Sequence, residues 1–424
     1  MFQTVFFYIF ILISVFNTLH FGMYIVGANI YDINKFRNKK TLQKRKRGIR
    51  PLVSIIIPAH NEEASIIRTL ESLKSNTYRK TEIIVIDDFS TDSTKKLVRD
   101  YITTHPKRSI RLMFKRQNVG KAGALNHALL HGVKGELVMT LDADSTLGKK
   151  SVANAVRYFD DPAVVGVAAN VRIPEASSIL GLLQKFEFMV GYRTKKFFTV
   201  SNSEFIIGGV ASTYRMSTLK AVKFYDHDII TEDIALSLKI VASGNKANKV
   251  VYGYDVIAET EGVQSFKDLL KQRYRWKLGN LQSIIKHRQL FANRDSKYSK
   301  MLTMYRIPMA FLGEILLLFD PLAIAYVIYI CMMLGNVSLL IGSYITITLY
   351  LVWNIMPDEH MSLMSKLKMC LYAPIMYFIM YIMNVVQVVA IVRCLLNYKK
   401  VLRTTATSST WQSPTRVSAT VTSL

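Results

Sequence analysis

The sequence has only three cysteines, and none of them precedes Cys331. The long stretch before that residue therefore offers no cysteine-based zinc site, no thiol nucleophile and no disulfide framework. Cys331, Cys370 and Cys394 all lie in an apolar region of the chain, where we expect them to be small packing residues.

Charge is absent from a long stretch at the beginning of the chain. Residues 1–31 contain no Asp, Glu, Lys or Arg. A helix rises about 1.5 Å per residue, so about 20 apolar residues cross a bilayer. The run is too long for the core of a signal peptide, and it lacks both a basic start and a small-residue cleavage site. We therefore predict an uncleaved transmembrane anchor over 1–34, with the crossing at 4–30.

Charge is nearly absent again towards the other end, where residues 315–357 contain only Asp320. We predict a C-terminal membrane region over 305–397. Its candidate spans, each close to bilayer length, are 309–334, 337–356 and 371–395.

Acidic residues are few beside basic ones, 30 against 55, which gives a net charge of +25. In a soluble protein this excess would indicate nucleic acid. Here the densest basic run, a juxtamembrane linker over 35–50, directly follows the anchor, where positive-inside bias and anionic headgroups explain it. We therefore expect a lipid bilayer as partner and no nucleic acid. The basic linker places the residues from 35 onward, and so the globular domain, in the cytoplasm. We therefore expect a multi-pass protein of the plasma membrane with a cytoplasmic globular domain.

Charge does not settle the topology of the C-terminal part. Lys366 and Lys368 indicate an inside loop, and a later group of basic residues indicates that the C-terminus is inside too. One span cannot separate two inside ends. Our interpretation is that 305–320, which carries Glu314 and Asp320, lies partly in the interface. Residues 398–424, rich in Ser and Thr, are predicted to form a flexible tail.

The middle of the chain alternates between apolar runs and amphipathic segments. The runs predict strands at 53–58, 82–88, 111–114 and 137–141. The segments between them predict helices at 62–75, 93–101 and 122–131. This alternation indicates an α/β domain with a mostly parallel sheet and right-handed crossovers, which we place at 51–264.

The second half of this domain is less regular. It predicts a strand at 164–168, a helix at 181–198, a glycine-interrupted strand at 206–214 and a helix at 234–243. Residues 265–290 interleave Lys and Arg with Leu, Tyr and Trp, which is typical of a helix at a membrane surface. We assign 265–304 to interfacial helices.

Asp142 and Asp144 follow the strand 137–141 directly. Ligands bind at this edge of open α/β sheets, and two carboxylates there suit Mg²⁺ or Mn²⁺ completed by phosphate oxygens. Asp87 and Asp88 end another strand at the same edge. A single pair of acidic residues at a strand end more often caps a turn. Because two such pairs meet at one edge of the sheet, we predict that they line a crevice of the size of a nucleotide sugar.

Three further stretches carry chemistry, and each has a simpler reading. The turn 57–63 could be a helix start capped by Asn61, with its two glutamates near the helix dipole. The acidic run 231–233 could be another cap. In 272–276 an Arg and a Trp three residues apart share a helix face, which could be interfacial anchoring.

Taken together, these motifs resemble the processive membrane glycosyltransferases of family 2. The resemblance covers roughly 50–300 with the flanking membrane segments and follows the family's order. It rests on SIIIPAHNEE (54–63), DD (87–88), KAGALN (121–126), DAD (142–144), TED (231–233) and QRYRW (272–276). The layout looks most like bacterial poly-N-acetylglucosamine synthases, and hyaluronan, chitin and cellulose synthases share the motifs.

The resemblance implies a GT-A-like, Rossmann-like fold with a mixed, mostly parallel sheet. It assigns Asp144, with Asp142, to the metal. The expected UDP-sugar contacts are Ala59, Asn61, Glu62, Asp88, Lys121, Asp142, Arg273 and Arg275. Lys121 would meet the phosphates, although a single lysine in so basic a chain could equally be solvated.

The resemblance assigns the catalytic base to Asp233. Acceptor contacts are expected from Glu232, Gln272 and Trp276. Gly208 and Gly209 would also contact the acceptor by allowing the backbone to approach it closely. A plain strand bulge at the two glycines is an equal alternative. After Trp276 the chain reads Lys277-Leu278-Gly279-Asn280, where relatives often have a run of small residues, and this weakens the subgroup assignment.

The function implied is an inverting, processive β-glycosyltransferase that makes an exopolysaccharide from a UDP-sugar, with UDP-N-acetylglucosamine as the expected donor. Its partners would be the donor, the growing polysaccharide, the bilayer and, as one option, a small membrane accessory subunit. Membrane helices beside the catalytic domain would let the polymer leave as it forms. The alternatives are a transferase adding one sugar to a lipid and an inactive nucleotide-binding scaffold.

Overall fold

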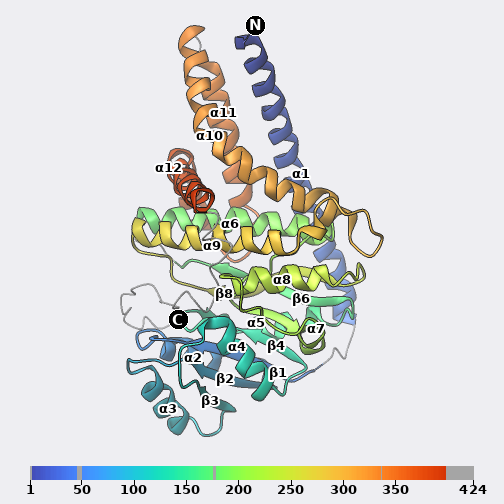
Figure 1. Ribbon diagram of the computed structural model, residues 1–424, viewed down its shortest axis with the longest axis vertical. Helices are drawn as coiled ribbons and strands as arrows, with labels where there is room; N and C mark the ends of the chain where they lie inside the picture. The colour runs from blue at the N-terminus through green and yellow to red at the C-terminus, as the bar shows by residue number, and fades with distance from the viewer. Residues whose placement is uncertain (1, 45–49, 175–177, 336, 398–424) are drawn as a thin grey trace.

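The computed structural model describes residues 2–44, 50–174, 178–335 and 337–397. Figure 1 shows three levels: upright helices at the top, helices lying across the molecule below them, and an α/β domain at the bottom. The predicted tail, 398–424, and residues 45–49 of the basic linker lie outside the described residues.

The first half of the sheet is parallel. Its strands are β1 (Val53–Ala59), β2 (Thr81–Asp87), β3 (Ile110–Phe114) and β4 (Leu137–Thr140). They lie in the order β3-β2-β1-β4, with crossover helices α2 (Ile66–Lys74), α3 (Thr94–Thr104) and α4 (Gly120–His131). Every residue of β1 is buried, as expected for an apolar run covered on both faces of a parallel sheet.

The second half makes the sheet mixed. β7 (Ser212–Arg215) is antiparallel to both β4 and β6 (Val164–Arg172). β8 (Lys249–Glu259) runs parallel to β6, and β5 (Thr146–Leu147) closes the edge antiparallel to β8. The sheet of eight strands in the described chain therefore confirms the predicted mixed, mostly parallel α/β sheet.

Alternation along β1 divides the core between the two faces of the sheet. Ile55 and Ile57 pack with α2, α3 and α5 (Ser151–Tyr158), while Ile56 packs with α4, α7 (Met216–Ala221) and α8 (Glu232–Ala242). Successive side chains of a strand point to opposite faces, so this buried strand holds two helical layers. The carboxyl ends of β1, β2 and β4 are thereby fixed next to one another.

The predicted strand at 206–214 is wrong over most of its length. Only Ser212–Arg215 forms a strand, and 204–211 is an irregular loop in which Ala211 has φ +53°. The backbone of this loop bonds to side chains of neighbouring elements instead of to a strand, as described below. Sequence periodicity also missed β5, β8, α5 and α7, and α8 begins at Glu232, earlier than predicted.

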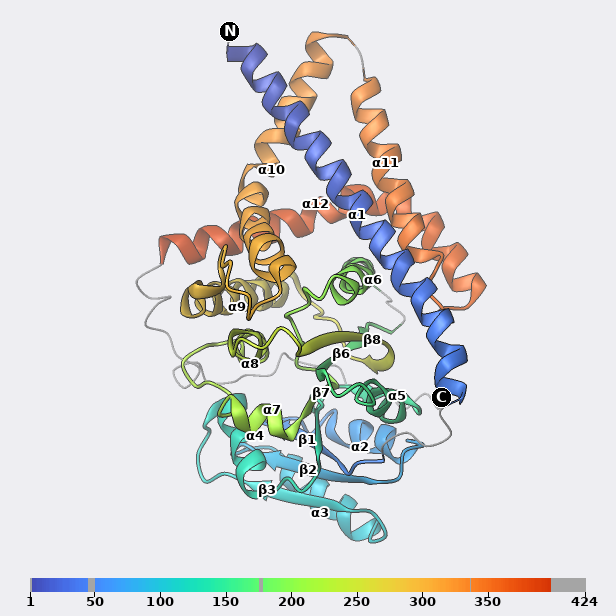
Figure 2. The same cartoon turned by 90° about the vertical axis from the view of Figure 1, so that its right-hand side faces the viewer.

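Three helices lie across the long axis above the sheet: α6 (Ile179–Val200), α9 (Phe266–Lys286) and α12 (Leu363–Leu396) (Figures 1 and 2). A 3-10 turn, Arg288–Leu290, and a π-helix, Met301–Arg306, connect α9 to the upright helices. The latter are α1 (Phe2–Lys44), α10 (Ile307–Met333) and α11 (Ser338–Ile355).

Three segments of the described chain are long and apolar enough to cross a membrane: Phe7–Lys35, Met301–Met333 and Phe378–Leu396. Helix α11 contains a shorter apolar stretch, Leu340–Ile355. Figure 2 shows that α12, which contains the third segment, does not run parallel to the upright helices but crosses their direction near the lower part of α10. The predicted span 371–395 therefore lies in a helix whose direction differs from that of α1, α10 and α11.

Apolar contacts explain the direction of α12. Met383 and Val386 pack with Leu183 of α6 and Leu269 of α9, and Met369 and Met376 pack near Phe186 of α6. One face of α12 is thus buried along much of its length against the transverse helices. Lipid would satisfy the same apolar side chains, so these specific contacts, and not apolar burial in itself, fix the crossing arrangement.

Candidate active site

The Asp142–Asp144 loop leaves β4 and is fixed by α2. Thr69 Oγ1 donates to the carbonyl oxygen of Ala143 at 2.8 Å, and Arg68 Nη2 donates to that of Asp144 at 3.3 Å. Arg68 also pairs with Glu261 at 2.5 Å, which ties the loop to the segment after β8. These contacts hold the two carboxylates at the carboxyl edge of the sheet, where the sequence placed them.

Lys121, in the first turn of α4, connects two motifs that lie far apart in the sequence. Its Nζ is 2.7 Å from Asp142 Oδ1 and 2.9 Å from Glu232 Oε1. Burial alone would lower the pKa of Lys121, but Asp142, Glu232 and Asp233 together raise it, so it stays charged. Its side chain is 18% exposed, which makes the alternative of a solvated lysine wrong.

Asp233 follows Glu232 in the first turn of α8. Burial, and then the negative charge of Glu232, raise the pKa of Asp233 to about 6, against the opposing effect of Lys121. Its Oδ1 accepts a hydrogen bond from the backbone N–H of Ile234 at 2.9 Å. A carboxylate with a pKa near the working pH is suited to act as a general base.

The loop 204–211 forms a wall of this cluster. A Cβ atom added to Gly209 would lie 3.1 Å from Lys121 Nζ and 3.5 Å from Asp233 Oδ2. Thr140 Oγ1, at the end of β4, donates to the carbonyl oxygen of Gly209 at 3.0 Å. The absence of a side chain at Gly209 therefore brings backbone close to the charged groups. Of the two alternatives for the glycines, the geometry favours close approach.

The turn after β1 was predicted to contact the nucleotide. Asn61 has φ +56°, and its Oδ1 accepts from the backbone N–H of Thr91 at 2.8 Å, so it organises the loop after β2. Helix α2 begins only at Ile66, so the alternative that Asn61 caps it is wrong. Glu62 is buried and accepts from Ser65 Oγ at 2.8 Å. Ala59, the last residue of β1, is fully buried.

Asp88 is fully buried at the end of β2. Its Oδ1 accepts from the backbone N–H of Val119 at 3.0 Å, whereas Oδ2 has no hydrogen-bond partner among the described residues. Burial raises the pKa of Asp88. Because buried acceptors are normally satisfied, this oxygen is a natural contact for an N–H group of a ligand.

Helix α9 packs directly against the Thr231-Glu232-Asp233 turn. A Cβ atom at Gly279 would lie 2.0 Å from Thr231 Oγ1, and Gln282 Oε1 accepts from the backbone N–H of Ile230 at 3.2 Å. The segment after Trp276 that departs from the family pattern thus supplies the glycine where helix and turn meet. Gln272 and Trp276 precede Gly279 by seven and three residues, so the helical period places them on its side of α9.

The two arginines of the QRYRW motif face different surroundings. Arg273 is buried, pairs with Glu187 of α6 at 2.5 Å and lies 4.0 Å from the centroid of the Trp276 ring. Its Nε and Nη1 atoms have no hydrogen-bond partner within the described structure. Arg275 is exposed. Contacts of these arginines with phosphate, and of Gln272 and Trp276 with an acceptor, stay predictions.

Some residues of the site carried no signal in the sequence. Arg68, Thr140 and Tyr225 belong to none of the recognised motifs. Tyr225 is buried, and burial together with Glu232 and Asp233 raises its pKa well above the ordinary value. Tyr225 lies beside the cluster because of the path that the chain takes between α7 and α8. The periodicity of the sequence does not predict that path.

The donor set fits a divalent cation that the protein holds only in part. Among the described residues, no group of three His, Cys, Asp or Glu side chains is arranged as a complete metal cage. Asp142 and Asp144 supply hard carboxylate oxygens at one loop, and one cation, Lys121, faces three carboxylates. This excess of negative charge suits a metal ion completed by diphosphate oxygens.

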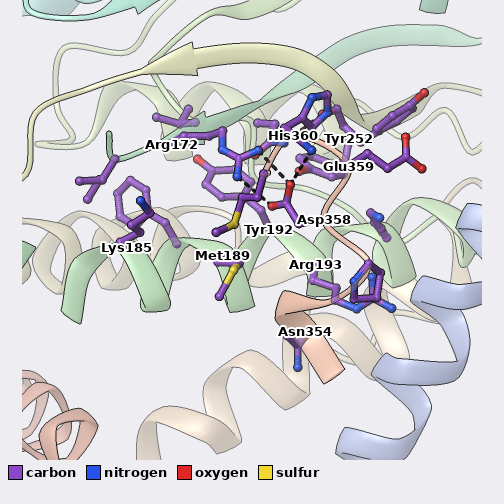
Figure 3. A pocket seen from close by; sticks show the side chains of 18 residues that line it. Arg172, Lys185, Met189, Tyr192, Arg193, Tyr252, Asn354, Asp358, Glu359 and His360 are labelled. Atoms are coloured by element: carbon purple, nitrogen blue, oxygen red, sulfur yellow. Dashed lines mark hydrogen bonds and ion pairs between the residues drawn. The ribbon is translucent and has the colours of Figure 1, made fainter. Parts of the chain in front are cut away.

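A second hollow is lined by none of the residues of this cluster (Figure 3). It is lined by β6, β8, α6 and the α11–α12 connection. Arg172 donates to both carboxylate oxygens of Asp358, at 3.1 and 2.9 Å, and His360 Nε2 lies 3.1 Å from the carbonyl oxygen of Tyr254. Its cations are largely paired within the protein, so this hollow is not assigned as the reaction centre.

Comparison with known proteins finds relatives of this part of the chain. Residues 54–222 match the sequence profile described as "Glycosyl transferase family 2". The poly-beta-1,6-N-acetyl-D-glucosamine synthase of Staphylococcus epidermidis is 30% identical over 274 residues, which cover 62% of this chain and 63% of that protein. The synthase of the same name from Staphylococcus aureus strain COL is 31% identical over 58% of each chain. The alignments thus span less than two thirds of these relatives.

A solved structure has the same fold. It is the mannosyltransferase PcManGT from Pyrobaculum calidifontis in complex with GDP-Man and Mn²⁺, with a TM-score of 0.54 and 23% identity. The match covers 80% of this chain and 97% of that one. The GT-A-like fold and the family 2 domain are both confirmed.

Proposed function

We propose that this chain, which carries a family 2 glycosyltransferase domain, is an inverting β-glycosyltransferase that polymerises the sugar of UDP-N-acetylglucosamine into an exopolysaccharide. The observation that carries the proposal is the convergence of Asp142, Lys121 and Glu232 beside Asp233, from three separate motifs. The names of the relatives support the choice of sugar. A scaffold without activity would have no need to keep all of the acidic motifs.

The donor would lie along the carboxyl edge of β1, β2 and β4. Asp88 and the 59–62 turn would hold the nucleoside, and the Asp142–Asp144 loop would face the diphosphate. A divalent cation held by Asp144 and Asp142 would neutralise the charge of the leaving diphosphate. Lys121, already between Asp142 and Glu232, would add a second positive charge within reach of the phosphates.

Transfer needs a base on the face of the sugar opposite UDP. Asp233 would take the proton of the acceptor hydroxyl while that oxygen bonds to the anomeric carbon and the bond to the diphosphate oxygen breaks. UDP leaves with the electron pair, and the configuration inverts. A pKa of about 6 leaves Asp233 mostly ionised at neutral pH and still basic enough to accept the proton.

The acceptor end would lie between Gly208-Gly209, Glu232 and the Trp276 side of α9. An indole ring offers a flat apolar face to a sugar ring, and Trp276 is kept in place by Arg273 beneath it. The Gly279–Thr231 contact connects this helix to the catalytic turn. An acceptor bound here would stay next to Asp233 between additions, which is what processive synthesis requires.

For the membrane we propose that α1, α10 and α11 cross it and that α12 lies in the cytoplasmic interface. Both ends of α12 then lie on the same side, and Lys366, Lys368 and Arg393 all remain inside, as the positive-inside rule favours. This replaces the earlier interpretation, in which 305–320 resolved the conflict of charges. The catalytic domain would face the cytoplasm.

The test uses membranes from cells expressing the full chain, incubated with each radiolabelled UDP-sugar and Mg²⁺ or Mn²⁺. We expect long polymer from UDP-N-acetylglucosamine that a hydrolase specific for its linkage degrades. Asp144→Ala should abolish both polymer and metal-dependent UDP binding, while Asp161→Ala, at an exposed ion pair with Lys249, should change neither. Single-sugar products on lipid would favour the non-processive alternative, and no transfer from any UDP-sugar would refute the proposal.

A further inference from the structure

The loop 204–211 begins with a buried carboxylate that none of the motifs includes. The Glu204 side chain is fully buried, and its Oε1 accepts from the backbone N–H groups of Phe205 and Ile206 at 2.9 and 2.8 Å. Its second oxygen, Oε2, accepts no hydrogen bond and lies 3.3 Å from Lys195 Nζ. A buried carboxylate is costly unless a cation and hydrogen bonds compensate it, and both are present here.

Lys195 reaches the loop from α6. Its Nζ donates to the carbonyl oxygen of Ile206 at 2.5 Å and also faces Glu204. The pair therefore bonds to three consecutive peptide units of the loop, two through Glu204 and one through Lys195. On the same side, the Arg306 guanidinium at the base of α10 lies 5.1 Å from the Phe205 ring centroid.

Beyond Ile206 the loop continues to the catalytic cluster. The backbone N–H of Ile207 donates to Ser237 Oγ at 3.0 Å, and that hydroxyl lies 2.6 Å from the carbonyl oxygen of Asp233. Gly209 follows, with its carbonyl oxygen bound to Thr140. One end of the loop is thus fixed to α6 by Lys195 and Glu204. The other end is fixed to the first turn of α8, which contains Asp233, and to β4.

We infer that Lys195 and Glu204 are positioning residues that fix the Gly208-Gly209 backbone over Asp233, and so set where the acceptor hydroxyl lies. This inference rests on the proposed function. The donor side of the site, Asp88 and the Asp142–Asp144 loop, is anchored by α2 and α4 and does not depend on the pair. Loosening the loop should therefore impair transfer to a sugar acceptor more than reactions of the donor alone.

The experiment compares Lys195→Met and Glu204→Gln with the charge-preserving Lys195→Arg in the full chain. Two rates are measured on each preparation: polymer formation and release of free sugar from the UDP-sugar to water. A displacement of the order of 1 Å reduces a transfer reaction by about tenfold to a hundredfold. We expect that loss in polymer formation for the first two variants, with shorter products and with hydrolysis within about twofold of wild type. Lys195→Arg should recover most of the polymer.

Lys196→Met is the matched control. Lys196 is the next residue of α6 and also forms a buried ion pair, with Asp32 at 2.6 Å, but it faces α1. Its loss should leave the ratio of polymer formation to hydrolysis unchanged. If hydrolysis and polymer formation fell in parallel in Lys195→Met, or if neither changed, the inference would be wrong.

Hydrogen exchange separates this inference from the proposed function. In Lys195→Met, the amides of 205–209 should exchange faster than in wild type, whereas those of α4 and β4 should not. This readout does not need turnover, so it remains decisive even if the wild type transfers no sugar. Unchanged protection of 205–209 would overturn the inference.

Discussion

Two groups of ion pairs differ in charge balance. In the catalytic cluster, one cation, Lys121, faces Asp142, Glu232 and Asp233. In the second group, which we call the membrane brace, four cations meet three carboxylates. The cations are Lys35, Arg172, Arg193 and Lys196, and the carboxylates are Asp32, Asp358 and Glu359.

The balance of charge shows what each group does. The brace connects α1 and the α11–α12 connection to α6 and β6, and its charges nearly cancel. Figure 3 shows four of its members, Arg172, Arg193, Asp358 and Glu359. The catalytic cluster has an excess of negative charge that lacks a counterion within the described protein. An uncompensated group of carboxylates is stable only if pKa values rise or a cation binds, and the raised pKa of Asp233 is the first of these effects.

The largest expected effect comes from Asp233, the proposed base. Asp233→Asn should reduce polymer formation by about a hundredfold to ten-thousandfold, the usual contribution of a general base. UDP binding should survive, because the donor contacts lie on other elements. Asp255→Asn, which removes a carboxylate bound to Tyr158 and Arg157 away from the cluster, serves as control. Near-normal turnover of Asp233→Asn would show that the base is misassigned.

The dependence of the rate on pH tests the raised pKa of Asp233, which results in part from this excess of negative charge. Asp233 accepts a proton only when ionised, and its pKa is about 6. The value of kcat/KM should therefore fall as the pH is lowered through about 6, approaching a tenfold loss per pH unit below it. Initial rates between pH 5 and 8 at saturating metal ion measure this limb. A flat profile down to pH 5 would contradict the assignment.

A steric change tests the contact between α9 and the catalytic turn. Gly279→Ala places a methyl group where Thr231 Oγ1 lies 2.0 Å away, so the helix or the turn must shift. Overpacking of this kind costs about 1–3 kcal/mol, and we expect a clear loss of activity along with lower stability. Gly191→Ala on α6, where no atom lies within 4 Å of the new carbon among the described residues, is the matched control. Equal activities of the two variants would argue against a role for this contact.

The smallest effect on catalysis should come from the brace. Arg172→Met leaves Asp358 without its bidentate partner, at a site where both side chains are less than one-fifth exposed. Loss of such charged hydrogen bonds costs roughly 1–3 kcal/mol. We expect a lower thermal midpoint in detergent with the activity per folded molecule nearly unchanged. A large loss of specific activity without a change in midpoint would place the brace in the reaction.

Much of the donor half was predictable because its signals are local. The apolar runs that become β1, β2 and β4 are short, buried and followed by polar turns, so periodicity located them within a residue or two. The carboxylates at their ends had to meet, because parallel strands share a carboxyl edge. Prediction failed in the second half because its contacts are not local. The loop 204–211 is held by hydrogen bonds to Glu204, Lys195 and Ser237, and such contacts produce no periodic pattern in the sequence.

The sequence by itself determined the α/β domain, the order of its motifs and the apolar segments that need a bilayer, since all of these depend on local pattern and composition. The tertiary structure alone decided that Lys121 bridges Asp142 and Glu232, that Gly279 meets Thr231 and that α12 runs across the direction of the upright helices. These outcomes depend on which faces of distant elements pack together. An apolar helix carries the same residues whether it buries them in lipid or against α6 and α9, so only packing could distinguish the two.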